Sequence, residues 1–196
     1  MPMVESYPNP FDTAVTSAMR AWLERAVIGL NLCPFAKAVH VRGQIHYAVS
    51  RAQTTAALAE ELARELQTLV TLDPDVRDTT LLMAPHCLSE FMEFNDFLGI
   101  AERILIDLQL NAVIQIASFH PDFQFSNTAA DDISNYTNRA PYPTLHLLRE
   151  TSVDRAVAAF PQAESIFERN IQTMEELGHA GWAELALGRA RPLSNT

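Results

Sequence analysis

The sequence predicts one α/β domain, a mixed sheet of four to five strands with α-helices packed on it. Segments with apolar residues at helical spacing alternate along the chain with short, continuous apolar runs, an order typical of this fold class. A length of 196 residues fits a single domain with a substantial core. We place the domain over residues 1–180 and expect 181–196 to form a peripheral C-terminal tail.

Helical spacing of apolar residues predicts four long helices and a short one. The first begins after Pro10 and ends before Cys33-Pro34, because a residue that precedes proline avoids the helical region. Thr151 and Asp154 have the spacing of a capping box that opens the short helix, and Gly178 stops the last one. The predicted long helices cover 11–26, 58–69, 89–108 and 166–177.

Short apolar runs predict strands over 44–50, 79–84, 112–119 and 144–149. Two alternating runs on either side of Arg42-Gly43 indicate a β-hairpin in which residues 36–41 pair with 44–50. Right-handed crossovers make the first three strands of the sheet parallel. The last strand is expected to return antiparallel at an edge.

Composition and charge limit the partners. With 24 acidic and 14 basic residues the formal net charge is −10, which argues against nucleic acid and against an anionic membrane surface. The chain shows no secretory signal pattern and no apolar run of the roughly 18 residues that a membrane span needs. Two cysteines fit a reducing compartment better than a disulfide scaffold. We therefore expect a cytoplasmic protein with a small-molecule ligand, whose oligomeric state the sequence leaves open.

The segment from Phe119 to Arg149 is the most informative part of the chain. It gathers histidines, aspartates, asparagines and arginines, with Phe and Tyr between them. Loops longer than about 12–15 residues are usually functional or disordered, and a disordered loop would be poor in aromatic residues. We therefore expect an ordered loop that builds a site.

The predicted topology brings separated polar residues to one edge of the sheet. His86 and His120 each follow a predicted parallel strand, and ligands of open α/β sheets bind at the carboxyl ends of such strands. With a hairpin over 36–50, Cys33 returns to the same edge. The expected site therefore combines Cys33 and His86 with the loop over 120–143.

These residue types suggest thiol-based acyl-transfer or hydrolytic chemistry on an anionic substrate. Cys33 would be the nucleophile, His120 the general acid–base and Asp122 its orienting carboxylate. Each also has a structural alternative, since free cysteine is often buried and a loop histidine often bonds to backbone.

Asn135, Arg139 and His86 are the predicted substrate-binding residues. An arginine in a proline-braced loop suits a carboxylate or a phosphate. The alternatives are an internal ion pair of Arg139 with Asp131 or Asp132, and turn capping by Asn135.

Metal binding is the alternative role of the histidines. His120 and Asp122, together with His146 or a cysteine, would suit Zn, Fe or Mn, although His146 between leucines also fits a core residue. No HExxH or paired CxxC pattern occurs. No cofactor is therefore predicted, with a divalent metal as the alternative.

Four segments resemble an uncharacterised bacterial family, the domain-of-unknown-function 1415 proteins. They are GLNLCPFA (29–36), SFHPDFQF (118–125), DDISNYTNRAPYPTLHLLRE (131–150) and IFERNIQTMEELG (166–178). The resemblance implies a cytoplasmic bacterial protein and brings no activity with it. It also implies family motifs that contain Cys33, His120, Asp122, Asn135, Arg139 and His146.

Three functional hypotheses follow. The first is a small-molecule enzyme, a hydrolase or transferase with a Cys/His/Asp/Arg site at the carboxyl ends of the strands. The second is a metal-binding protein that uses His120 and Asp122. The third is a non-enzymatic interaction module that uses the aromatic loop over 119–143. An exposed aromatic patch would favour the third, and burial of Phe123 and Phe125 would count against it.

Overall fold

The computed structural model describes residues 9–160 and 165–188. At its centre is a four-stranded mixed sheet in the order β1-β2-β4-β3. The strands are β1 (Ile45–Val49), β2 (Thr79–Met83), β3 (Ile114–Phe119) and β4 (Thr144–Arg149). β1 and β2 are parallel, and β4 is antiparallel to both β2 and β3. The predicted α/β class with a mixed sheet is therefore confirmed.

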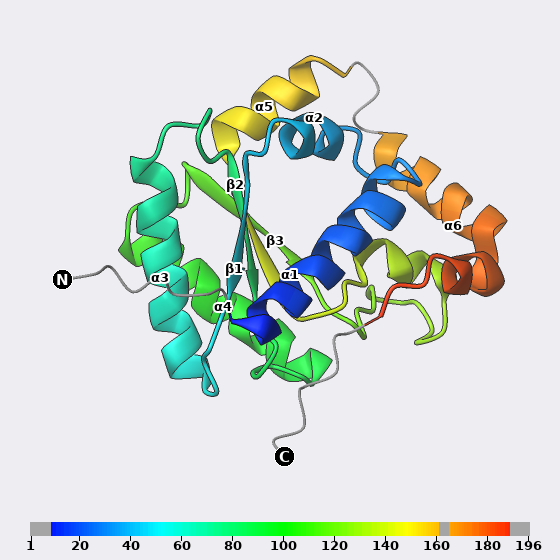
Figure 1. The fold of residues 1–196 in the computed structure, drawn as a ribbon, viewed down its shortest axis with the longest axis horizontal. Helices are drawn as coiled ribbons and strands as arrows, with labels where there is room; N and C mark the ends of the chain where they lie inside the picture. The colour runs from blue at the N-terminus through cyan, green and yellow to red at the C-terminus, as the bar shows by residue number, and fades with distance from the viewer. Residues whose placement is uncertain (1–8, 161–164, 189–196) are drawn as a thin grey trace.

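Helices surround this sheet (Figure 1). They are α1 (Pro10–Trp22), α2 (Ala36–Val41), α3 (Thr55–Thr71), α4 (Phe91–Asp107), α5 (Glu150–Ala158) and α6 (Ile166–Glu184), with a π-helix η1 (Leu23–Ile28) and a 3₁₀-helix η2 (Ile133–Asn138). Each of the four predicted long helices is present, with bounds that differ by a few residues. No described helix is both long and apolar enough to cross a lipid bilayer.

The last strand lies inside the sheet. β1, β2 and β3 run in the same direction, as predicted, but β4 is inserted between β2 and β3. The predicted edge position of β4 is therefore wrong. Its burial suits an interior strand, because Leu145 and Leu147 are both at most 2% exposed. β3 becomes an edge strand, and its Gln115 is exposed.

One face of the sheet is sealed by α3 and α4. Leu58, Leu62 and Leu66 repeat every four residues and form a buried stripe on α3. This stripe meets Phe94 and Phe97 of α4 over the leucines of β2 and β4 in one apolar core. Such a core supplies most of the stability of a domain of this size.

The other face is crossed by α1 and η1. Val15 and Met19 are buried against Met83 of β2 in a second core. The first turn of α1 lies at the carboxyl end of β1, where Asp12 forms an ion pair with Arg51 at 2.7 Å. From there the helix runs diagonally over the sheet toward α6 (Figure 1).

The segment before β1 is helical. Residues 36–41 form α2, so the predicted hairpin with 44–50 is wrong. The run Ala-Lys-Ala-Val-His-Val alternates in polarity, but six residues are too few to separate a period of 2 from one of 3.6, and Ala and Lys favour helix. Gly43 has a φ of 69° and turns the chain from α2 into β1.

Two helix ends differ from the prediction. α5 begins at Glu150 with no side-chain cap, so the predicted capping box is wrong: Thr151 already lies inside the helix. Gly178 (φ 62°, ψ 177°) interrupts α6 where the last predicted helix ends, and helical residues resume up to Glu184. The predicted tail thus begins in helical structure, while 189–196 lie outside the described residues. The domain boundary at residue 180 stays a prediction.

Candidate functional site

The loop between β3 and β4 is ordered by its own polar side chains. The amide oxygen of Asn135 accepts hydrogen bonds from the backbone N–H of Phe125 (2.9 Å) and the hydroxyl of Thr128 (2.8 Å). Its amide nitrogen donates to the carbonyl oxygen of Ala129 (2.8 Å). Asn135 is fully buried, so these three bonds leave its amide directed at the loop itself.

Arg139 is also directed at the loop. Its Nε donates to the carbonyl oxygen of Phe123 (3.1 Å) and its Nη2 to that of Ala130 (2.6 Å). The guanidinium carbon lies 4.2 Å from the centroid of the Tyr136 ring, a cation–π contact. Tyr136 in turn packs edge-on against Trp182 of α6. Arg139 therefore clamps both halves of the loop.

His120 lies at the carboxyl end of β3, as expected, and is fully buried. Its Nδ1 accepts a hydrogen bond from the backbone N–H of Asp122 (3.0 Å). The proton must then sit on Nε2, which donates to the carbonyl oxygen of Leu88 (3.1 Å). The ring also packs between Phe91 and Phe94, with centroids 5.5 and 5.2 Å away. Backbone groups therefore occupy both ring nitrogens and hold one tautomer.

His86 and Asp122 lie at this same edge and face outward. His86 is exposed and stacks on Phe11 of α1, with ring centroids 4.8 Å apart. Asp122 is exposed, and it approaches His120 through its backbone N–H. The structure thus brings His86, His120, Asp122 and the loop together, as the topology predicted.

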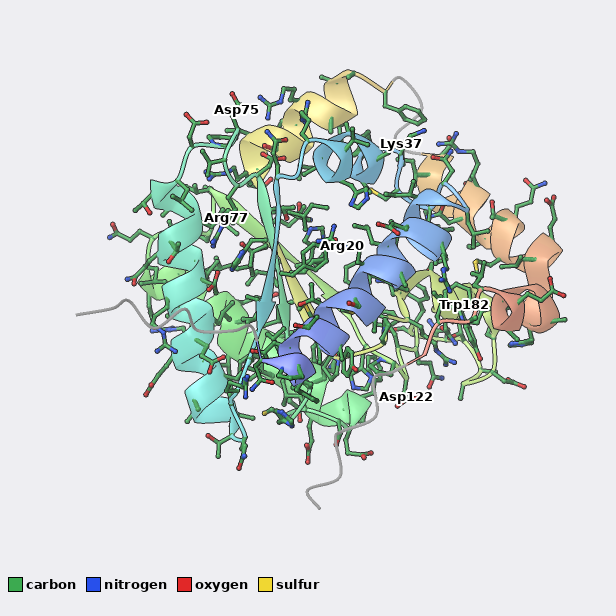
Figure 2. All side chains as sticks on the ribbon, in the orientation of Figure 1. Arg20, Lys37, Asp75, Arg77, Asp122 and Trp182 are labelled. Atoms are coloured by element: carbon green, nitrogen blue, oxygen red, sulfur yellow. The ribbon has the colours of Figure 1, made fainter. Side chains whose placement is uncertain are left out.

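Cys33 lies elsewhere. Because residues 36–41 are helical, the chain after Cys33 passes the amino end of β1 through α2. The neighbouring Leu32 accepts a hydrogen bond from Asn170 of α6 (2.9 Å). Figure 2 shows Lys37 of α2 and Asp122 at opposite ends of the molecule. The expected convergence of Cys33 with the His120 edge depended on the hairpin and is lost with it.

The thiol of Cys33 is not activated by its surroundings. Burial raises its pKa, although backbone hydrogen bonds from Phe35 and Ala36 act in the opposite direction. Burial likewise raises the pKa of Cys87. Both cysteines are therefore thiols at neutral pH, and thiolate chemistry at Cys33 would need a base.

Neither the metal nor the aromatic-patch alternative gains geometric support. Within the described ranges, no three His, Cys, Asp or Glu side chains are arranged to hold a metal ion. Phe123 is half-buried against Phe91 and Phe125, with ring centroids 5.3 and 4.9 Å away, and Tyr142 is 6% exposed. These aromatic side chains pack into the protein.

A second group of polar side chains lies on the sheet face under α1. Tyr47, Leu81, His146 and Ala117 are cross-strand partners in one row through β1, β2, β4 and β3. Side chains opposite each other in neighbouring strands share a face. Leu81 is buried, but the other three are half-buried, whereas Leu82, Leu145 and Leu147 on the α3–α4 face are sealed. The residues of this row are therefore less completely buried than the leucines at the centre of the other face.

His146 is the polar group at that centre. It is flanked by Phe119 (ring centroids 6.1 Å apart), and no other described residue forms a hydrogen bond with its ring nitrogens. Burial lowers its pKa to about 4. His146 is therefore a neutral imidazole at physiological pH, with nitrogens free to bind a ligand.

Arg20 and Tyr47 lie together on the same face of the sheet as His146. The Arg20 guanidinium carbon lies 4.8 Å from the centroid of the Tyr47 ring, and Figure 2 shows Arg20 between α1 and the sheet. No described residue pairs with the Arg20 charge. The Tyr47 hydroxyl is buried and lacks a hydrogen-bond partner among the described residues. Burial raises the pKa of Tyr47, so the phenol keeps its proton.

We call Arg20, Tyr47 and His146 the open-face cluster. A free cation, a phenol donor and a neutral imidazole can together bind a small anion and accept or donate a proton beside it. Sequence reasoning missed Arg20 and Tyr47. The even spacing of Tyr47 and Val49 with Ile45 gives their common face, but only the strand register pairs that face with His146.

The fold and these sites define a mixed-sheet α/β protein with helices on both faces of the sheet and a half-buried row of side chains under α1. The family model of the protein of unknown function DUF1415 matches residues 14–184. The chain belongs to this family, as its motifs indicated. Neither curated proteins nor solved structures gave a match to the chain.

Proposed function

We propose that this protein is a small-molecule enzyme whose substrate carries an anionic group and binds at the open-face cluster. The observation that carries the proposal is the half-buried imidazole of His146, which forms no hydrogen bond with a described residue and lies on an interior strand of the sheet. Buried polar groups normally have hydrogen-bond partners, and exceptions concentrate at functional sites. The Tyr47 hydroxyl, on the far side of Leu81 from His146, is such a buried group without a partner among the described residues.

The geometry suits a small ligand. Tyr47 and His146 are separated by one strand, which places their Cα atoms about 10 Å apart. Leu81 lies between them and is itself buried. A small ligand would therefore reach Tyr47 and His146 from their partly exposed sides.

The chemistry follows from charge. Arg20 is an unpaired guanidinium that can anchor a carboxylate or phosphate through two hydrogen bonds. An anion placed beside His146 would raise the pKa of the imidazole from its depressed value. His146 would then act as the proton acceptor, and the Tyr47 phenol as the hydrogen-bond donor.

A nucleophilic role of Cys33 is a separate proposal. Cys33 packs against the same apolar core as Tyr47 and Leu81, but among the described residues its thiol makes no contact with the open-face cluster that would favour a thiol step. Metal binding through His120 and Asp122 has less support, since backbone groups already occupy both ring nitrogens of His120. An interaction module built on the 119–143 loop has less support for the reason given above, the packing of its aromatic rings.

Consumption of metabolites from a defined mixture tests the proposal. The mixture contains small carboxylates and phosphates, and mass spectrometry follows each compound over time with wild-type protein and with variants. His146→Gln and Arg20→Gln should each lower the rate of any consumed compound at least about tenfold, the range for a lost acid–base or charged contact.

Matched controls share the element of the changed residue or its type. His46→Gln lies on the same strand as Tyr47 but on the opposite face, and Arg64→Gln changes an exposed arginine of α3. Both should keep the wild-type rate. Equal loss in His146→Gln and His46→Gln would contradict the proposed site. A Cys33→Ala protein with the full rate would remove the thiol step and leave acid–base chemistry.

A further inference from the structure

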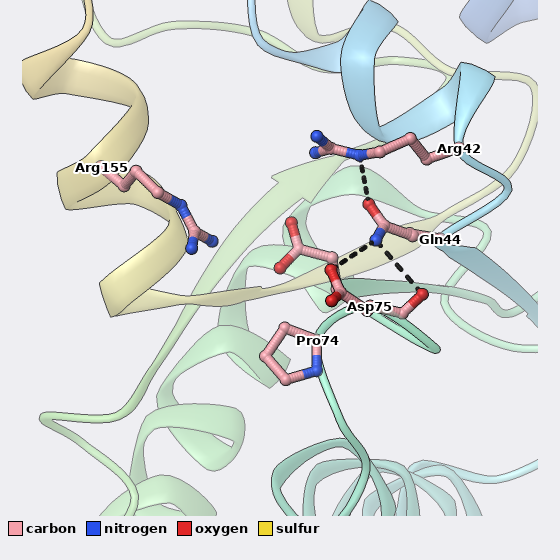
Figure 3. A pocket seen from close by; sticks show the side chains of 6 residues that line it. Arg42, Gln44, Pro74, Asp75 and Arg155 are labelled. Carbon is pink, nitrogen blue, oxygen red and sulfur yellow. Dashed lines mark hydrogen bonds between the residues drawn. The ribbon is translucent and has the colours of Figure 1, made fainter.

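A polar pocket lies at the opposite edge of the sheet from His120. It has a volume of about 200 Å³ and is lined by Arg42, Gln44, Pro74, Asp75, Asp78 and Arg155. Figure 3 shows Arg155 on α5 and Arg42 after α2 on facing walls of this pocket. Phe35 and Phe160 meet edge-on at 5.9 Å and join the same two segments beyond the pocket. None of the lining residues belongs to the open-face cluster.

On one wall an amide separates an arginine from an aspartate. Arg42 Nε donates to the side-chain oxygen of Gln44 (2.7 Å). The Gln44 amide nitrogen donates to the backbone carbonyl of Asp75 (3.2 Å) and to its carboxylate (3.4 Å). Gln44 is only 5% exposed, so its burial holds these contacts in place.

On the other wall a serine hydroxyl lies between an aspartate and an arginine. Ser152 Oγ donates to Asp78 Oδ1 (2.6 Å) and accepts from Arg155 Nη2 (3.0 Å). Asp78 is 8% exposed, and a buried carboxylate normally pairs with a cation. Here it reaches Arg155 only through the serine.

Charged groups of both signs therefore face one pocket without direct pairing. None of the ion pairs between described residues involves Arg42, Arg155, Asp75 or Asp78. A guanidinium has five N–H donors, and each of these two arginines uses a single nitrogen in the contacts described. Both arginines keep donors for a ligand, and both aspartates keep an acceptor oxygen.

We propose that this pocket binds a small zwitterion, a molecule that carries one carboxylate and one ammonium group. The two guanidiniums receive the carboxylate, and Asp75 and Asp78 receive the ammonium. The pocket is smaller than the roughly 300–1,000 Å³ of sites for drug-sized ligands, which favours a ligand of amino-acid size. The two positive charges of the arginines equal the two negative charges of the aspartates, so a ligand without net charge keeps the pocket neutral.

A protein-observed NMR titration tests the proposal with named probes. Glycine, β-alanine and 4-aminobutanoate are compared with butanoate and butylammonium, which each carry one of the two charges. We expect at least one zwitterion to bind about tenfold or more tightly than both singly charged probes, since each of these probes lacks one of the two charged contacts. The amide shifts should centre on residues 42–44, 75–78 and 152–155.

Arg155→Gln is the main variant, because this exposed side chain contributes to the pocket without supporting the core. It should weaken zwitterion binding at least about fivefold, and Arg64→Gln should leave it unchanged. Saturable binding of butanoate as tight as that of the best zwitterion would overturn the proposal, because the pocket would then be an anion site. Absence of saturable shifts with every zwitterion, or unchanged binding in Arg155→Gln, would overturn it as well. His146→Gln should not affect this titration, so its outcome is independent of the function proposed above.

Discussion

Burial sets the ionisation state of His146. The imidazole lies on an interior strand beside Phe119, and its depressed pKa reflects the loss of solvation of the charged form. Its ordinary value in an unfolded chain is about 6.5. Between about pH 6.5 and pH 4, His146 is therefore protonated in the unfolded state but neutral in the folded state. Its contribution to the free energy of unfolding falls as the pH drops through this window.

Comparing His146→Gln with the wild type over pH 4–8 measures this effect. Glutamine does not titrate, so the free energy of unfolding of the wild type should fall relative to the variant by about 1–3 kcal/mol between pH 7 and pH 4. Above pH 7 the difference should be constant. Urea unfolding at each pH gives the values, and a difference that does not vary with pH would contradict the buried neutral imidazole.

Asn135 shows how a polar side chain can be structural. Its amide makes three hydrogen bonds to the 125–129 segment while fully buried. Asn135→Ala should lower the free energy of unfolding by about 2–4 kcal/mol, since the loop groups would lose their partners away from water. The urea midpoint measures the change.

Asn95→Ala, on the exposed side of α4, is the matched control and should stay within about 0.5 kcal/mol. A change in Asn135→Ala no larger than in this control would show that the loop does not depend on the amide.

The sequence located some of these residues but not their contacts. His120 and Asp122 were expected at the end of a strand because strand ends can be predicted from apolar runs. The partner of His120 is the carbonyl oxygen of Leu88, a backbone group that no residue type could reveal. Arg20 could not be predicted, because an exposed arginine on an amphipathic helix is common and only the fold places it over Tyr47.

At the scale of elements, long apolar patterns were informative and short ones were not. The four leucines of α3 are enough to define its buried side. Residues 36–41 are too short for such a pattern, and the error there misplaced Cys33 at the wrong edge of the sheet. The insertion of β4 between β2 and β3 could not be predicted, because its pairing depends on strands more than twenty residues away.

Gly178 produces the kink in α6. Its φ of 62° and ψ of 177° lie in a region open almost only to glycine, so Gly178→Ala should destabilise the protein by about 1–3 kcal/mol. The kink sets Trp182 against Tyr136, so the tryptophan fluorescence should change too. Thermal or urea unfolding and fluorescence together measure the effect.

Gly99→Ala is the control for this substitution. Gly99 lies within α4, has ordinary helical geometry and has no atom within 4 Å of an added Cβ. Alanine should stabilise this position by about 0.5–1 kcal/mol. Stabilisation in both variants would contradict the constraint that we assign to Gly178.

Across the whole molecule, the two faces of the sheet differ in their packing. α3 and α4 seal one face into a dry core, whereas α1 leaves solvent access to His146 on the other. The loop over 120–143 supports the carboxyl edge through backbone contacts of His120 and Arg139. The residue types of this loop predict a site, whereas its hydrogen bonds favour a supporting role.

The central claim is that the open-face cluster binds a small anion. Its most direct test is an NMR titration of the isotope-labelled protein with acetate, succinate and inorganic phosphate at low ionic strength, following the ring nitrogens of His146. We expect a saturable shift of the His146 resonances with at least one probe, with binding weakened about fivefold or more in Arg20→Gln and unchanged in Arg64→Gln. His146 resonances that do not respond to any probe, or a response that Arg20→Gln leaves intact, would contradict it.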